Sequence, residues 1–170
     1  PFGSVVPSSI NPVLITAFPD LAYDSWVTIG LESTPNNAIG EGAINTAGTS
    51  WVTAFEGGND LDISDPIGGG WYALGGDANG TPTEGFRVLL GQFTTDGALG
   101  GQLQVQIFEH GDQMNAHYEW TRLLYFSCRD AFSVLHSSNS CLTFDIFASS
   151  ASNSLKSSVF FAVIVFICAS

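Results

Sequence analysis

The sequence predicts an all-β fold, an antiparallel β-sandwich over residues 10–112, followed by a C-terminal extension for which a helix is one interpretation. Short runs of Val, Ile, Thr, Phe and Trp alternate with clusters of Gly, Asn, Asp and Pro, a pattern typical of strands joined by turns. All 19 glycines and 7 prolines lie at or before Gly111, so the last 59 residues contain neither. This break predicts a β-domain over residues 1–115 and a separate Ser-, Phe- and Cys-rich tail over residues 116–170.

Six segments are expected to be strands: residues 13–18, 25–32, 50–55, 70–74, 86–94 and 102–109. Residues 25–28 read Ser-Trp-Val-Thr, and the same four residues recur at positions 50–53, which favours two similar strands in one sandwich. In the first copy, Val27 shares one face with Ile29 and Leu31, because strand side chains alternate. Trp26 is therefore expected on the outer face.

The last two predicted strands have the clearest local pattern. Three glutamines alternate with three aliphatic residues, so one face is expected to be apolar and the other wet. The residues concerned are Gln102, Gln104 and Gln106 on one side and Leu103, Val105 and Ile107 on the other. The connection over residues 95–100 contains Asp96-Gly97, a turn signal that predicts a hairpin between the two strands.

The charge is concentrated in the first part of the chain. Residues 1–115 carry 13 acidic side chains and Arg87 as the single basic one. Such a surface repels phosphates and anionic headgroups, so nucleic-acid binding and electrostatic membrane docking by this domain are not expected. Cations, sugars and basic protein partners remain candidate ligands.

A calcium site is one interpretation of the densest polar segment. Calcium takes six to eight oxygen ligands in flexible geometry. The candidate ligands are Glu56, Asn59, Asp60, Asp62 and Asp65. Their spacing does not follow the EF-hand pattern. The alternative is a solvated acidic turn.

The tryptophans allow two interpretations. Trp26, Trp51 and Trp71 would form a flat platform for sugar rings if their faces were exposed, since indole combines an apolar face with a polar N–H. Three tryptophans in a Gly-rich β-domain are also ordinary core packing. A second glycan-related signal is the acceptor triplet Asn79-Gly80-Thr81, which Pro82 weakens.

Three segments carry a resemblance to a protein family. They are Tyr23-Asp24-Ser25-Trp26-Val27-Thr28-Ile29-Gly30, Phe55-Glu56-Gly57-Gly58 and Val88-Leu89-Leu90-Gly91-Gln92-Phe93-Thr94-Thr95-Asp96-Gly97. Over residues 13–112 the chain resembles β-rich modules that recur in large predicted secreted or surface proteins of aquatic bacteria and algae. The resemblance implies a β-rich fold and an extracellular or cell-surface location, and it transfers no catalytic residue.

The tail has several open interpretations. Residues 118–135 are compatible with an irregular amphipathic helix. Small residues at 149–151, a polar spacer and the apolar run 159–169 follow the order of a glycolipid-anchor signal. The alternatives are a translated intron or shifted frame and a genuine extension. Eleven apolar residues are too few for a transmembrane helix.

The expected function is a non-enzymatic extracellular module with a structural or adhesive role, assisted by calcium. Its expected partners are proteins or glycans at a cell surface. The alternative is a carbohydrate-binding module or a glycan-active enzyme that uses the three tryptophans and nearby acids.

Overall fold

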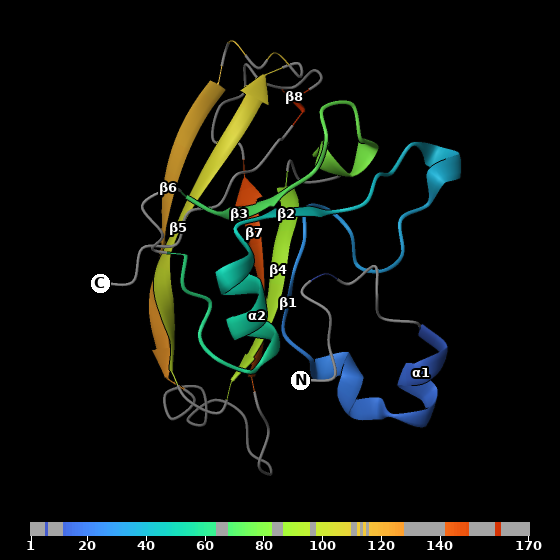
Figure 1. Cartoon of the computed structure of the whole chain (residues 1–170), viewed down its shortest axis with the longest axis vertical. Coiled ribbons are helices and arrows are strands. Elements are labelled where there is room, and N and C mark those ends of the chain that lie inside the picture. Colours follow the sequence, from blue (N-terminus) through green and yellow to red (C-terminus); the bar gives the residue numbers. More distant parts are fainter. Residues whose placement is uncertain are drawn as a thin grey trace.

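The computed structural model describes residues 6, 12–63, 68–82, 87–95, 98–109, 112, 114, 116–127, 142–149 and 159–160. Over these residues the chain is β-rich, with antiparallel strands in three small sheets and few helices (Figure 1). The predicted β-rich character is therefore confirmed.

The first sheet has the order β1-β4-β7. Its central strand β4 (Arg87–Thr95) pairs with β7 (Leu142–Ser149) along its length and with the two-residue strand β1 (Trp26–Val27) on the other side. Beyond β1, the amides of Thr28 and Gly30 still donate to carbonyls of β4, at 2.9 and 2.8 Å. The predicted strand 25–32 is thus realised as a short strand with a hydrogen-bonded extension.

The second sheet has the order β6-β5-β8. Here β5 (Ala98–Glu109) pairs with β6 (Ala116–Ser127) over most of its length and with β8 (Val159–Phe160) at one end. The predicted strands 86–94 and 102–109 are confirmed, but the hairpin between them is wrong, since β4 and β5 belong to different sheets. The Asp-Gly pair is a local turn signal, and such a signal does not specify that the strands on either side of it pair with each other.

The structure also corrects the tail. The helix predicted from residue 118 is wrong as far as residue 127, where the chain forms β6; residues 128–135 lie outside the described ranges. Aromatic and Thr residues in this stretch favour a strand, and the absence of Gly and Pro suits long ladders. Strands of the tail therefore pair with β4 and β5 beyond the composition break at Gly111.

Two predicted strands are helices instead. They are α1 (Pro12–Ala17) in place of 13–18 and α2 (Thr49–Glu56) in place of 50–55. Trp51 and Phe55 are four residues apart, so a helix buries both on one side, and both are buried. The repeated Ser-Trp-Val-Thr is therefore a strand in one copy and a helix in the other. The Val and Thr residues of this tetrapeptide favour a strand, and they led to the wrong prediction for the second copy.

A third, two-stranded sheet joins β2 (Asn45–Ala47) to β3 (Gly70–Tyr72), which confirms the strand predicted at 70–74 over three residues. Short 3-10 helices complete the described elements: η2 (Pro19–Tyr23), η3 (Asn37–Ile39) and η4 (Ala78–Gly80). In Figure 1, α2 lies in front of the strands, below β2 and β3, while α1 lies at the side away from β5 and β6.

One apolar core joins these elements. It draws on both larger sheets, on β3 and on α2: Val27, Ile29, Leu31, Ile44, Trp51, Phe55, Ile63, Trp71, Ala73, Val88, Leu90, Leu103 and Val105. The predicted inner faces are confirmed for residues 25–32, at Val27, Ile29 and Leu31, and for residues 102–109, at Leu103 and Val105. Two expectations are wrong: Trp26 is buried, at 7% exposure, and Gln106 is buried, at 8%, with its amide donating to the Tyr118 hydroxyl at 3.0 Å. The glutamine face is therefore not uniformly wet.

The helical state of α2 is testable with substitutions at two positions that lie roughly on opposite sides of the helix, about 200° apart. Phe55→Ala should lower the free energy of unfolding by about 3 to 5 kcal/mol, because it empties a core position in contact with Phe93. Thr53→Ala, at an exposed helical position, should raise it by up to about 0.5 kcal/mol, because Ala is the better helix former. Urea unfolding measures both. A destabilising Thr53→Ala would instead indicate a strand.

Candidate functional site

The acidic segment begins where α2 ends. The amides of Gly57 and Gly58 donate to carbonyls of the last helical turn, at 3.1 and 3.0 Å, and Gly58 has a φ of 85°. Asn59 then donates twice to the carbonyl of Ala54, from its backbone amide at 3.1 Å and from Nδ2 at 3.0 Å. The side-chain nitrogen of Asn59 therefore closes the helix end.

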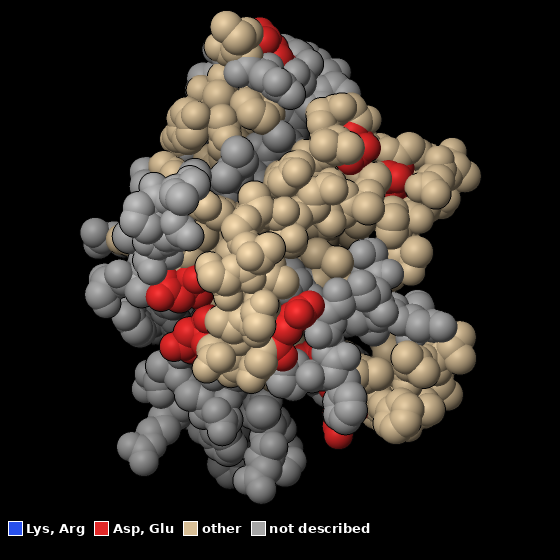
Figure 2. Space-filling model, in the orientation of Figure 1, with Lys and Arg blue, Asp and Glu red and all other residues tan. Residues whose placement is uncertain are grey.

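The carboxylates of this segment lie on the surface. Glu56, Asp60 and Asp62 are exposed, and Asp65 lies outside the described residues. Figure 2 shows acidic side chains on either side of α2 and no blue on the described part of this face. Within the described ranges, no three His, Cys, Asp or Glu side chains lie close enough together to hold a metal ion. Calcium binding here stays a prediction.

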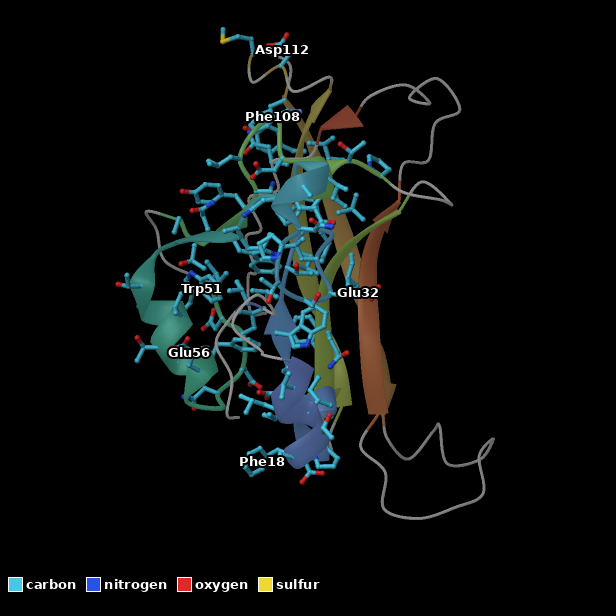
Figure 3. The ribbon with its side chains drawn as sticks, turned by 90° about the vertical axis from the view of Figure 1, so that its right-hand side faces the viewer. Phe18, Glu32, Trp51, Glu56, Phe108 and Asp112 are labelled. Carbon is cyan, nitrogen blue, oxygen red and sulfur yellow. The ribbon has the colours of Figure 1, made fainter. Side chains whose placement is uncertain are left out.

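All three candidate sugar-binding tryptophans are buried. Trp51 is 4% exposed and Trp71 is not exposed, and their ring centroids lie 6.0 Å apart at a 47° tilt. Each indole N–H donates to a backbone carbonyl, from Trp51 to Ala47 at 2.7 Å and from Trp71 to Thr28 at 2.8 Å. A sugar stacks on an exposed ring face. The structure therefore places these rings, with buried Trp26, in the core, where Trp51 lies between α2 and the strands (Figure 3).

The best-connected polar side chain belongs to a residue that the sequence suggested only as a weak glycan acceptor. Asn79, 5% exposed, lies in η4 and joins two segments far from it in sequence. Its Nδ2 donates to the Ile29 carbonyl at 2.8 Å, and its Oδ1 accepts from the Gly42 amide at 2.9 Å. One side chain thus holds three segments: the extension of β1, the loop before β2, and the β3–β4 connection. We call this the Asn79 clamp.

Two glycines make the clamp possible. A Cβ on Gly30, whose φ is +71°, would overlap the carbonyl oxygen of Asn79, and one on Gly42 would overlap the Asp77 carboxylate. The Asp77 carboxylate accepts from the Leu74 amide at 2.9 Å and so closes the turn that leads into η4. At Gly30 the contact is with backbone atoms and φ is positive, so the position requires glycine; at Gly42 a side chain would require the Asp77 carboxylate to move.

The clamp also bears on whether Asn79, in the glycan acceptor triplet, can carry a glycan. Attachment of a glycan needs the Asn79 Nδ2 atom, which is buried and donates to Ile29. A sugar attached to this buried atom would have no room, and it would replace a hydrogen of the Nδ2 donor on which the contact with Ile29 depends. Glycosylation of Asn79 is therefore incompatible with the folded state, and this weak sequence signal is wrong for the folded chain.

A second polar cluster lies where β1 begins. The Ser25 hydroxyl accepts from the Thr94 amide at 3.0 Å and donates to the Thr94 carbonyl at 3.3 Å, so it extends the β1–β4 ladder by one residue. Asp24 Oδ1 accepts from the Ser25 amide at 3.0 Å. Asp24 Oδ2 is the buried side-chain atom among the described residues for which no hydrogen-bond partner is found. No group of metal-ligating side chains in those ranges includes it.

Neither a scan against protein-family models nor searches of curated proteins and of solved structures found a match to this chain. The resemblance to surface-protein modules therefore stays a prediction. Among the helices in the described ranges, none has the length and apolarity needed to cross a membrane.

The contact between Gly30 and η4 is testable by adding one methyl group. Gly30→Ala should lower the free energy of unfolding by at least about 3 kcal/mol, because a positive φ alone costs about 1 to 3 kcal/mol in a residue with a side chain and the methyl also meets Asn79. Urea unfolding provides the measurement.

Two neighbouring glycines separate the causes. Gly76 has a φ of +103° and open space around it, so Gly76→Ala should show only the backbone penalty of about 1 to 3 kcal/mol. Gly75 has open space and no such φ, and Gly75→Ala should stay within about 0.5 kcal/mol. Equal losses for Gly30→Ala and Gly76→Ala would contradict the close contact with Asn79.

Proposed function

We propose that this chain is a non-enzymatic extracellular module with a structural or adhesive role, built on an antiparallel β-sandwich. The observation that carries the proposal is the use of buried and half-buried polar groups in the described residues. The amide of Asn79, the indoles of Trp51 and Trp71 and the hydroxyl of Ser25 all bond to main-chain atoms of distant or neighbouring segments. These groups fix loops to sheets, which is what a load-carrying or presenting scaffold requires.

The sandwich is supported by the shared core. Val88 and Leu90 on β4 and Leu103 and Val105 on β5 are buried in the same cluster, although the two strands belong to different sheets. Alternate residues of two sheets that bury into one core are the pattern of face-to-face packing.

The surface supports an adhesive role. Thirteen acids against one base in residues 1–115 favour a basic protein partner or a divalent cation and disfavour nucleic acid. Among the described strands, β6 and β7 each stand at the end of a sheet. An edge strand offers backbone donors and acceptors to a strand of another protein. Both features suit contact with proteins at a cell surface.

The location and the adhesive role are tested on the encoded protein. Protease added to intact cells that produce it should release peptides from residues 12–109 without lysis. Beads coated with the full chain should also bind those cells more than beads coated with the destabilised Gly30→Ala chain. Peptides released only after lysis would contradict the extracellular location, and equal binding by both bead types would contradict a folded adhesive surface.

Calcium assistance has its own test. At a calcium concentration about 100 times Kd, the free energy of unfolding should rise by about 2.7 kcal/mol and the Tm by roughly 5 to 10 °C. EDTA should reverse the shift. In the double variant Asp60→Asn with Asp62→Asn, the shift should disappear, because both changes remove charged oxygen ligands.

A matched control removes the same charge elsewhere. Asp20 and Glu32 are exposed, and Glu32 lies across the molecule from Glu56 in Figure 3. The variant Asp20→Asn with Glu32→Gln should keep the calcium-dependent shift. A shift that is absent in the parent chain, or lost equally in both variants, would rule out a specific site at Asp60 and Asp62.

A further inference from the structure

We propose that Asn79 is a deamidation site gated by folding: its amide is protected while the clamp is closed, and its loss after unfolding prevents refolding. The inference goes beyond the proposed extracellular role and does not depend on it. Asn79-Gly80 is the single Asn-Gly pair in the whole sequence. An Asn followed by Gly is the pair most open to deamidation, because glycine has no side chain to hinder attack by its own backbone nitrogen.

The reaction needs only water. The backbone nitrogen of Gly80 attacks Cγ of Asn79 and loses its proton; the new N–Cγ bond closes a five-membered succinimide while the Cγ–Nδ2 bond breaks. The former amide nitrogen leaves as ammonia and takes up that proton. Water then opens the ring at either carbonyl. The products are aspartate at position 79 or isoaspartate, in which the main chain runs through the former side chain.

In the folded chain, hydrogen bonds hold both reacting groups and oppose ring closure. The nucleophile, the Gly80 amide, donates to the Asp77 carbonyl at 3.1 Å. The electrophile is fixed at both ends, with Nδ2 of Asn79 on the Ile29 carbonyl and Oδ1 on the Gly42 amide. Asn79 and Gly80 are both buried, so water and base have little access. Ring closure therefore requires the clamp to open.

Neither product fits the closed clamp. Aspartate replaces the Nδ2 donor by an oxygen, which would face the Ile29 carbonyl oxygen with no proton between them. Such a buried, unpaired charge is strongly destabilising. Isoaspartate lengthens the backbone by one carbon in a segment already packed so closely on Gly30 that a methyl group would overlap it. A chain deamidated while unfolded is thus expected to stay unfolded.

The test follows mass and refolding of the full chain together. Two samples are kept at the same mildly alkaline pH, one folded and one unfolded in urea. Both are then digested with a protease, and the mass of the peptide containing residue 79 reports the change from amide to acid. Deamidation should be at least about tenfold slower in the folded sample, because it waits for local opening. The fraction of the urea sample that refolds on dilution should fall in step with the amide remaining at position 79.

Two variants give an independent readout. Asn79→Asp, which creates one product directly, should fail to fold or should lose most of its stability. Asn37→Asp makes the same change at an exposed position and should fold like the parent. Equal deamidation rates in folded and unfolded samples, normal refolding of chains acidic at position 79, or a stable Asn79→Asp variant would each overturn the proposal.

Discussion

The two hydrogen bonds of the Asn79 amide are the constraint on which the rest of the described structure depends. They join Ile29, on the extension of the first strand, to Gly42, in the loop that leads to β2. Both partners are main-chain groups, so removal of the amide leaves a buried carbonyl and a nearby N–H without partners. Each such loss costs about 1 to 3 kcal/mol. A domain with a total stability of about 5 to 15 kcal/mol depends heavily on such a contact.

Side-chain hydrogen bonds matter this much because the neighbouring strands are short and form few backbone hydrogen bonds. β1 has two residues, and β2 and β3 have three each. Few backbone hydrogen bonds hold these strands, yet Val27 and Ile29 are completely buried. The indole of Trp71 on the Thr28 carbonyl and the hydroxyl of Ser25 on Thr94 add the missing links. Polar side chains thus position the apolar core in this half of the molecule, whereas the longer strands β4 and β5 are held by their own ladders.

The sequence predicted what local periodicity determines and failed where distant contacts decide. The alternation around Leu103 and Val105 correctly assigned a strand and its buried face. The same four residues, Ser-Trp-Val-Thr, became a helix at position 50, because Trp51 and Phe55 pack from one helical face against partners that no local pattern reveals. The structural role of Asn79 was missed for the same reason. The local sequence indicated only a glycan acceptor triplet, because its partner Ile29 lies 50 residues earlier in the chain.

The acidic segment shows a different conflict, between charge and helix geometry. The C-terminal end of a helix carries partial negative charge, which favours basic side chains there. α2 has no basic residue in its last turn, ends at Glu56, and is followed by exposed Asp60 and Asp62. Each carboxylate near that end opposes the helix dipole by a few tenths of a kcal/mol up to about 1 kcal/mol. Asn59 offsets part of this cost, because its side-chain amide donates to the Ala54 carbonyl at 3.0 Å. Under the proposal made above, a cation or a basic partner bound at the exposed Asp60 and Asp62 would offset the rest of this cost.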